Sequence, residues 1–424
     1  MLRRIGTRYG KKFSFYYRSV RSVPVPEKAE RGGEDAFLSL SNVQAVLDGV
    51  SWWKENAGVN AGLYSAALAR TMCEYVEDEL LGDAPASSFR LLERGYESCK
   101  HGDVLGTCTA LVATLQEPQE DIQQKDRYEA VLLEGPSLTF TGASTTRAPL
   151  TAAHAASTAA AAAASAAVAA VDGAMGESDI AMESTAGPDA AVTHAATTAD
   201  LHQAFARFHR TDDVDNYLLD VVYVGDCSVM LIRDGQVCFV TDEQAHHLDY
   251  PYQLGTGSTD TPKDGVRMLI PVEKGDVVVM GTDGIFDNLY PRRIAELVWP
   301  PLERVFRQHG YPHSMGDDTV TAASDVVSYE KNRNLRTLLV DDIMAALEAG
   351  SSAVMLRATA VSGDVHCDSP YASKCIEHGA LFEGGKPDDM TLLVSVIGEC
   401  DDDQSGERFS SSQAAYPPPY RDWP

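Results

Sequence analysis

Acidic residues stand at the edges of strand-like apolar runs at five separate places in this chain. They are Glu34-Asp35 in GGEDAF, Asp48 in LDGV, Asp226 in VGDCS, Asp283 in TDGIFDN and Asp388-Asp389 in GGKPDDMTLLV. One Asp-Gly pair is an ordinary turn signal. Five such sites, spread over the patterned part of the chain, favour a fold in which strand ends converge on one place.

Carboxylates that are held close together cannot all stay ionised unless a cation lies among them. No His or Cys cluster accompanies these acids, and an all-oxygen site favours Mg²⁺ or Mn²⁺. Two such ions can activate water and hold the oxygens of a displacement at phosphorus. Spacing alone leaves the simpler explanation open, in which each Asp-Gly is only a turn.

The pattern along the chain predicts an α+β fold. Strands are expected within 37–50, 106–115, 217–241, 277–281 and 390–398, and helices within 55–81, 87–100, 291–310, 334–350 and 369–379. Arg233-Asp234-Gly235 between two β-rich runs indicates a hairpin. Hairpin-linked strands and blocks of helices favour antiparallel sheets over βαβ repeats.

Three segments differ in composition from this pattern. Residues 1–30 are rich in Arg and Lys, and no acid precedes Glu27, which is typical of a mitochondrial targeting arm. An Ala-rich, low-complexity insertion is expected at about 117–212. A polar, Pro-rich tail follows at 399–424. The predicted globular domain therefore spans 31–398 and is interrupted once.

The composition limits the partners. A net charge of -27 argues against a nucleic-acid-binding surface, and no apolar run is long enough to span a membrane. The eight cysteines form no CxxC pair, so free thiols are expected rather than a zinc site or a disulfide framework. Pro417-Pro418-Pro419-Tyr420 in the tail is compatible with a WW-type groove, although chance explains so short a match better.

The ordered series of motifs resembles the metal-dependent protein phosphatase (PPM) family, the type 2C serine/threonine phosphatases, and in particular its compact mitochondrial and plastid branch. The blocks are GEDAF, LDGV, GVNAGLYS, GTCTALV, VGDCSVMLIRDGQV, EQAHHLDYPYQLG, GDVVVMGTDGIFDNL and SPYASKCIEHGALFEGGKPDDMTLLV. They cover about 32–116 and 215–398. The resemblance implies a four-layer αββα sandwich, with two antiparallel sheets face to face and a metal site at one end.

The resemblance also assigns metal ligands. Asp48 would bridge two Mn²⁺ or Mg²⁺ ions, with the Gly49 carbonyl and Glu34 at one of them. Asp283 and Asp388 would bind the other ion. A weaker third site would use Asp226 together with Asp283.

Three further acids would support these ligands without binding the two principal ions. They are Asp35, Asp287 and Asp389, of which Asp35 would hold metal-bound water. Asp48 and Asp283 would thus be the principal catalytic residues. The implied reaction is hydrolysis of a phosphoserine or phosphothreonine in a protein, by direct attack of a metal-bridging water and without a phosphoenzyme. The branch implies the mitochondrial matrix.

The sequence departs from the family pattern near two of its motifs. Many members have His where this chain has Val50, so the general acid is left unassigned. Ser51-Trp52-Trp53 stands where Gly-Gly-Trp is expected. Arg31 is out of register with the Arg that holds substrate phosphate in many members. We interpret His246 and His247 as packing or hydrogen-bonding groups rather than ligands.

Two alternative functions remain at this point. A pseudophosphatase would keep the fold as a binding or scaffold module, but the principal acids are all present. A hydrolase with an aspartyl nucleophile would use VVVMGTDGIFDN as its nucleophile loop. That chemistry requires Asp-x-Asp after a strand, and the spacing here differs.

Overall fold

The computed structural model describes residues 12–81, 87–100, 102–116, 131–134, 217–310 and 326–400 of the 424-residue chain. Residues Met1–Ser137 and Leu201–Pro424 form one compact unit. A second unit, Leu138–Asp200, lies wholly outside the described residues. All of the elements named below belong to the first unit.

Two antiparallel sheets form the centre of this unit. The five-stranded sheet has the order β1 (Lys12–Val23), β14 (Met390–Cys400), β13 (Val277–Gly281), β7 (Ser228–Arg233) and β8 (Gln236–Val240). The seven-stranded sheet has the order β2 (Ala36–Ser39), β3 (Val43–Gly49), β4 (Thr107–Gln116), β6 (Tyr217–Val224), β12 (Val266–Val272) and β5 (Val131–Glu134), with β11 (Leu254–Gly255) paired to β4. A separate small hairpin joins β9 (Ala245–His247) to β10 (Tyr250–Pro251).

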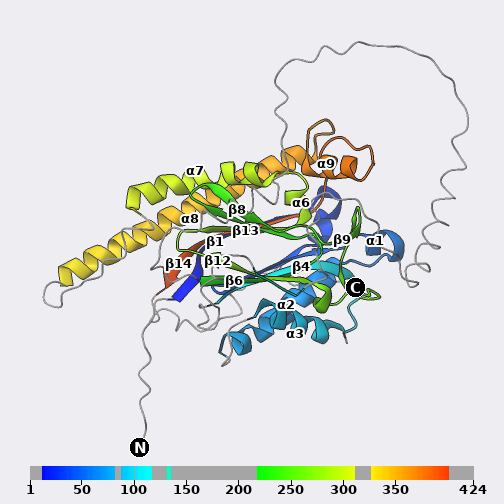
Figure 1. The fold of residues 1–424 in the computed structure, drawn as a ribbon, viewed down its shortest axis with the longest axis horizontal. Coiled ribbons are helices and arrows are strands. Elements are labelled where there is room, and N and C mark those ends of the chain that lie inside the picture. Colours follow the sequence, from blue (N-terminus) through cyan, green and yellow to red (C-terminus); the bar gives the residue numbers. More distant parts are fainter. Residues whose placement is uncertain are drawn as a thin grey trace, which may run out of the picture. The chain divides into compact units, whose positions relative to one another are not determined.

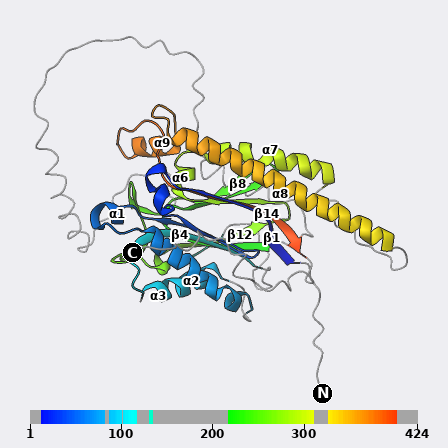
Figure 2. The ribbon, with the colours of Figure 1, turned by 180° about the vertical axis from the view of Figure 1, so that it is seen from behind.

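Helices cover the outer face of each sheet (Figure 1). α7 (Pro291–His309) and α8 (Val326–Ser362) lie on the five-stranded sheet, and α2 (Gly62–Leu81) and α3 (Ser88–Lys100) lie on the seven-stranded sheet. The reverse view shows the same order of layers (Figure 2). Short helices complete the unit: η1 (Pro26–Arg31), α1 (Trp52–Ala57), η2 (Pro262–Asp264), α6 (Asp283–Phe286) and α9 (Pro370–Glu377). The predicted α+β sandwich with antiparallel sheets and outer helices is confirmed.

The alternation of side chains along β13 shows why the layers stack in this way. Val277 and Val279 pack into the cluster beneath α7 and α8, whereas Val278 and Met280 pack into the cluster between the two sheets. Successive side chains of a strand point to opposite faces, so a strand buried on both faces must be apolar throughout. The run VVVM meets this condition.

The hairpin between β7 and β8 and the outer helices also follow from local sequence signals. Asp234 and Gly235, with φ of 49° and 76°, form the turn of the predicted hairpin between β7 and β8. Positive φ at both central residues gives a turn whose twist matches that of the strands. The expected helices are present, although Gly58, with φ of 67°, ends α1 and divides the predicted stretch 55–81 into α1 and α2. α8 also begins before and ends after the predicted 334–350.

The predicted boundary between a basic arm and the domain at residues 30–31 is wrong. β1 pairs with β14 from Lys12 to Val23, and Phe15 is fully buried between the sheets. Tyr17 is buried on the other face of β1, in the cluster beneath α7 and α8, so this segment is a strand covered on both faces. Residues 1–11 lie outside the described residues, so the targeting function remains a prediction.

The predicted insertion contains one described element. β5 (Val131–Glu134) pairs with β12 at the edge of the seven-stranded sheet, and the rest of 117–216 lies outside the described residues. β14 continues to Cys400, just past the expected start of the tail at 399, and residues 401–424 with the Pro-Pro-Pro-Tyr segment are likewise outside.

Two further expectations concern the described residues alone. All seven cysteines whose side chains are described are free thiols. Within those same ranges, no helix is both long and apolar enough to cross a membrane.

Candidate functional site

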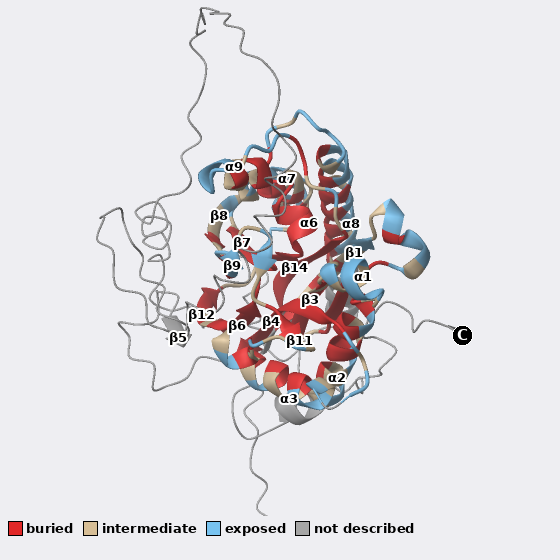
Figure 3. Ribbon diagram, turned by 90° about the vertical axis from the view of Figure 1, so that its right-hand side faces the viewer, coloured by how far each residue is buried: buried red, intermediate tan, exposed pale blue. Residues whose placement is uncertain are grey.

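The elements that carry the five acidic motifs, among them β3, β7, α6 and β14, lie together at one end of the sandwich (Figure 3), and the charges of their acids act on one another, in what we call the acid cluster. Its members are Glu34, Asp35, Asp48, Asp226, Asp283, Asp287, Asp388 and Asp389. The first two precede β2, Asp48 lies near the end of β3, and Asp226 lies in the turn between β6 and β7. Asp283 begins α6, Asp287 caps its end, and the last two immediately precede β14. Strand ends from both sheets therefore supply the cluster, as the sequence predicted.

The glycine that follows each principal aspartate has a role in packing rather than in a turn. Gly49 lies within β3, and a Cβ there would approach the Glu34 carbonyl oxygen to 2.6 Å. Gly284 lies within α6, and a Cβ there would approach the Asp389 carbonyl oxygen to 2.0 Å. Only glycine permits such close backbone contacts. The simple turn explanation for these two Asp-Gly pairs is therefore wrong.

Three acids of the cluster, Asp35, Asp48 and Asp226, lie close to other acids and form no ion pair in the described part of the chain, and their pKa values are raised. Burial, followed by the nearby charge of Asp283, raises the pKa of Asp48 and of Asp226 well above the usual value. Burial and the charge of Asp389 raise the pKa of Asp35 to about 8. We call these three residues the inner acids. Like charges in a low-dielectric site disfavour ionisation, and such an arrangement is typical of functional sites.

Three carboxylate oxygens in the cluster are buried without a hydrogen-bond partner. They are Oδ1 of Asp35, Oδ1 of Asp226 and Oδ1 of Asp283. Buried acceptors without a partner are rare in proteins, because each costs about 1–3 kcal/mol. A hard divalent cation with oxygen ligands would satisfy them, so the donor set fits Mg²⁺ or Mn²⁺.

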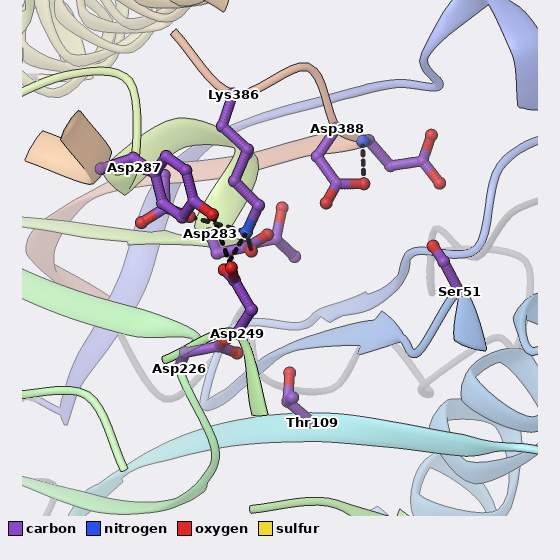
Figure 4. Close-up of polar contacts among 12 residues, drawn as sticks. Ser51, Thr109, Asp226, Asp249, Asp283, Asp287, Lys386 and Asp388 are labelled. Atoms are coloured by element: carbon purple, nitrogen blue, oxygen red, sulfur yellow. Dashed lines mark hydrogen bonds and ion pairs between the residues drawn. The ribbon is translucent and has the colours of Figure 1, made fainter. Parts of the chain in front are cut away.

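Lys386 balances one side of the cluster (Figure 4). Its Nζ lies 2.6 Å from Asp283 Oδ2 and 2.8 Å from Asp287 Oδ2. Lys374 of α9 contacts the other oxygen of Asp287, with Nζ 2.8 Å from Oδ1. Burial alone would raise the pKa of Asp283, but the Lys386 ammonium outweighs it, and the pKa of Asp283 is lowered. Asp287 thus anchors two lysines, which fits its predicted supporting role.

Lys28 balances the opposite side. Its Nζ lies 2.8 Å from Glu34 Oε2 and 3.1 Å from Asp388 Oδ1, and it donates to Ser51 Oγ at 2.7 Å. Ser51 Oγ in turn donates to Glu34 at 2.7 Å. Burial alone would lower the pKa of Lys28, but the charges of Asp388, Asp389 and Glu34 raise it. The serine that replaces the expected glycine therefore joins the site.

Asp389 fixes the backbone around the cluster. Its Oδ2 accepts a hydrogen bond from the Glu34 amide and its Oδ1 accepts one from the Val25 amide, each at 2.7 Å. A carboxylate that accepts from backbone amides is well stabilised in its charged form. Asp389 thereby ties the segment before β2 to the start of β14 and holds the two acidic motifs side by side.

The sequence analysis missed the lysines of this site. Lys28 lay in the segment assigned to an arm, and no local signal distinguishes it from the neighbouring basic residues. Lys386 lies in the quoted motif GGKPDD, two residues before Asp388, but its role was not inferred. Lys28, and not Arg31, contacts the acids. His246 hydrogen-bonds Asp260, with Nε2 3.0 Å from Oδ2, as expected for a hydrogen-bonding group rather than a ligand.

The acids do not form a ready-made ligand set. Among the described residues, no group of three or more His, Cys, Asp or Glu side chains is arranged to hold a metal ion. Lys28 and Lys386 occupy oxygens that ions would share. The structure therefore brings together every acid that the resemblance named, and it leaves the three buried oxygens as the ones available to a cation.

Comparison with known sequences gives relatives of one kind. No family model matches the chain. It is 26% identical over 393 residues to "Probable protein phosphatase 2C 26" of Arabidopsis thaliana, an alignment that covers 89% of this chain and 82% of the relative. It is 24% identical over 198 residues to "Protein phosphatase PTC7 homolog" of Homo sapiens, covering 45% of this chain and 53% of the relative. The chain spans only 34% of "Probable protein phosphatase 2C 80" of Arabidopsis thaliana, at 29% identity over 42% of this chain.

Comparison with solved structures gives phosphatases at low similarity. The photosystem II phosphatase PBCP aligns over 91% of this chain and 98% of its own, with a TM-score of 0.49 and 21% identity. The catalytic domain of the phosphatase PstP, solved with two manganese ions, aligns over 91% of this chain and 100% of its own, with a TM-score of 0.42 and 11% identity.

These sequence relatives are named as type 2C or PTC7 protein phosphatases, the kind of protein that the motifs resemble. They also confirm the predicted enzyme class, a protein phosphatase. Their names give no cellular compartment.

Proposed function

We propose that this chain is a metal-dependent serine/threonine protein phosphatase whose reaction takes place at the inner acids. The observation that carries the proposal is the set of buried carboxylate oxygens without partners on Asp35, Asp226 and Asp283. Such oxygens are costly unless a cation satisfies them. Two bound Mn²⁺ or Mg²⁺ ions would supply a water of lowered pKa and charge to offset that of the phosphoryl oxygens.

Each part of the acid cluster has a distinct task in this proposal. Asp48 and Asp283 would hold the ions together with Glu34, Asp388 and the Gly49 carbonyl, and a weaker third site would use Asp226 with Asp283. Asp35 would orient water, and it is itself oriented by Thr282, whose Oγ1 donates to Asp35 Oδ2 at 3.0 Å. Asp287 and Asp389 would keep the lysines and the backbone in place.

Lys28 contacts Asp388 at 3.1 Å, and the charges of Lys28 and Lys386 both act on the Asp388 carboxyl group. Their side chains are 11% and 23% exposed, so solvent reaches both. A phosphate dianion that enters between them would meet a positive charge on each side, although the chain as a whole is strongly acidic. The two lysines would therefore orient the phosphoryl group of a phosphoprotein.

The cellular location belongs to the same proposal. The basic composition of residues 1–30 supports import into the mitochondrial matrix. Since β1 begins at Lys12 and Lys28 reaches the site, cleavage that leaves the enzyme intact would fall before Lys12. The amino-terminal sequence of the mature protein would test this position.

The test of the catalytic proposal is phosphate release from phosphothreonine peptides by the full chain in Mn²⁺, in Mg²⁺ and in EDTA. Asp283→Asn is compared with Asp234→Asn, the same change at an exposed hairpin residue. Bound metal is counted by mass spectrometry in each protein. We expect metal-dependent release, lost in EDTA and in Asp283→Asn together with bound metal, and kept in Asp234→Asn. Release that is equally fast in EDTA would refute metal dependence.

A metal-free binding module is the second candidate, because Lys28 and Lys386 already neutralise several of the acids. Folded protein that retains no Mn²⁺ and releases no phosphate would favour this reading.

A further inference from the structure

The connection from β9 to β10, with Tyr252, forms a surface that we call the aromatic hairpin (residues 245–252). It lies at the same end of the sandwich as α1, α6 and α9 (Figures 1 and 3). Tyr371 donates a hydrogen bond to Asp249 Oδ2 at 2.5 Å. Asp249 Oδ1 also lies 3.9 Å from the Nζ of Lys386, which contacts Asp283. The tip of the hairpin is therefore one side chain away from the acid cluster (Figure 4).

The rings of the hairpin are held in fixed positions. His246 stacks on Tyr252 with centroids 3.9 Å apart and an interplanar angle of 10°, and its other neighbour, Tyr250, lies at 5.1 Å. Asp260 fixes His246 through Nε2 and also accepts a hydrogen bond from the Gln253 amide at 3.0 Å. Tyr250 nevertheless remains 50% exposed. A ligand that binds such a surface loses little side-chain entropy from the protein.

The charge around these rings selects the kind of ligand. Residues 241–253 contain Asp242, Glu243 and Asp249 but no Lys or Arg, and the whole chain carries a net charge of -27. Lys374 pairs with Glu243, and Lys386 lies 3.9 Å from Asp249, whose side chain is still 47% exposed. An exposed tyrosine face beside carboxylates attracts guanidinium and ammonium groups, and acidic peptides are repelled.

We propose that the aromatic hairpin binds a basic side chain, preferably Arg, that lies within a few residues of the phosphorylated Ser or Thr in a substrate protein. This inference rests on the proposed phosphatase function and names the substrate class for it. The guanidinium stacks on Tyr250 and faces Asp249, while the phosphate enters between Lys28 and Lys386. The hairpin is thus a specificity determinant that acts on the flanking sequence and not on the phosphate.

The test uses three sets of phosphothreonine peptides. In each set one flanking position at a time, before or after the phosphothreonine, carries the same residue, which is Arg in the first set, Ala in the second and Glu in the third. kcat/KM for each peptide is measured for the full chain in Mn²⁺. It is divided by kcat/KM for p-nitrophenyl phosphate, which has no flanking residue. The variants are Tyr250→Ala, Tyr250→Phe and Tyr75→Ala, the last a tyrosine of α2 that lies outside the hairpin. Binding of the same peptides, fluorescently labelled, is measured by anisotropy in EDTA.

We expect Arg to be preferred over Glu at one or more positions by about tenfold, the equivalent of about 1.4 kcal/mol, mainly through KM. Tyr250→Ala should remove most of this preference, and Tyr250→Phe and Tyr75→Ala should keep it. Equal kcat/KM for all peptides, or an Arg preference that survives in Tyr250→Ala, would overturn the inference. If no peptide is hydrolysed, the proposed phosphatase function fails, and the anisotropy measurements still decide whether the hairpin selects basic peptides.

Discussion

Asp283 and Asp226 belong to the same acid cluster, where the charge of Asp283 acts on Asp226, yet their pKa values shift in opposite directions. Burial alone would raise the pKa of both carboxyl groups. Lys386 contacts Asp283 directly and turns its shift downward, whereas the pKa of Asp226 stays well above the usual value. The other five acids of the cluster, which we call the outer acids, have lysine or backbone-amide partners, and among the described residues the inner acids have none of either kind. Lysines and backbone amides of the fold therefore offset the negative charge of the outer acids but not that of the inner acids.

This difference has a functional meaning. A protein that needed only stability could have paired every acid or replaced the inner acids with apolar residues, which is often neutral or stabilising. Here the unpaired oxygens lie together at the end of the sandwich where the predicted catalytic motifs meet. The unbalanced centre is therefore the part of the cluster that we expect a cation to complete.

The largest effect on the metal-free protein should come from pH. The inner acids have pKa values above those of an unfolded chain, about 8 for Asp35, and burial raises that of Asp388 to about 6. The folded state then binds more protons than the unfolded state between about pH 4 and pH 8. Stability should fall across this window as pH rises, by about 1.4 kcal/mol per pH unit for each extra proton.

Urea unfolding at pH 5 and pH 8 in EDTA measures this change, and adding Mn²⁺ at pH 8 should reverse much of it. A midpoint that does not decrease between the two pH values would mean that the inner acids are balanced in the native state.

The second-largest effect should come from removing the ammonium group of Lys386. Lys386→Met should destabilise the metal-free protein by about 3–5 kcal/mol, because it leaves Asp283 and Asp287 buried with one charge partner fewer. Lys263→Met is the matched control, since its side chain is 77% exposed and lies 3.9 Å from Glu93. That change should cost less than about 1 kcal/mol. Equal effects in urea unfolding would show that Lys386 does not balance the cluster.

Metal binding should stabilise the protein by satisfying the inner acids. A ligand present at 100 times its Kd stabilises the native state by about 2.7 kcal/mol, so Mn²⁺ should raise the Tm. The gain should be lost in Asp48→Asn and kept in Asp234→Asn. Calorimetric scans with and without Mn²⁺ test this, and a gain of the same size in Asp48→Asn would place the ion elsewhere.

The smallest effect should have the opposite sign. Asp226→Asn removes a buried carboxyl group that forms no ion pair among the described residues and that the charge of Asp283 disfavours. In EDTA at pH 8 this change should stabilise the protein by about 1–3 kcal/mol. Asp389→Asn makes the matching change at an acid that accepts two backbone amides, and it should destabilise instead. If both variants shift the urea midpoint in the same direction, the distinction between inner and outer acids is wrong.

Much of the fold and most of the acid cluster could be predicted from the sequence, because the signals are local. The apolar run of β13 requires burial on both faces, Asp234-Gly235 specifies a hairpin, and each acid stands beside its own strand. The resemblance then supplied the order of the motifs. Each of these features depends on residues that are close together in the sequence, so a local sequence pattern is enough to predict it.

The role of residues 12–30 and the balance of charge were decided only by the tertiary structure. Residues 12–23 look like part of a basic arm until β1 pairs with β14, which is more than 360 residues away in the chain. Lys28 contacts Asp388, which follows it by 360 residues. The glycines after Asp48 and Asp283 read as turns until the backbones that approach them are known. The sequence determined which residues carry charge. Packing decided which charges have partners, because burial and contact between distant segments set the pKa of each group.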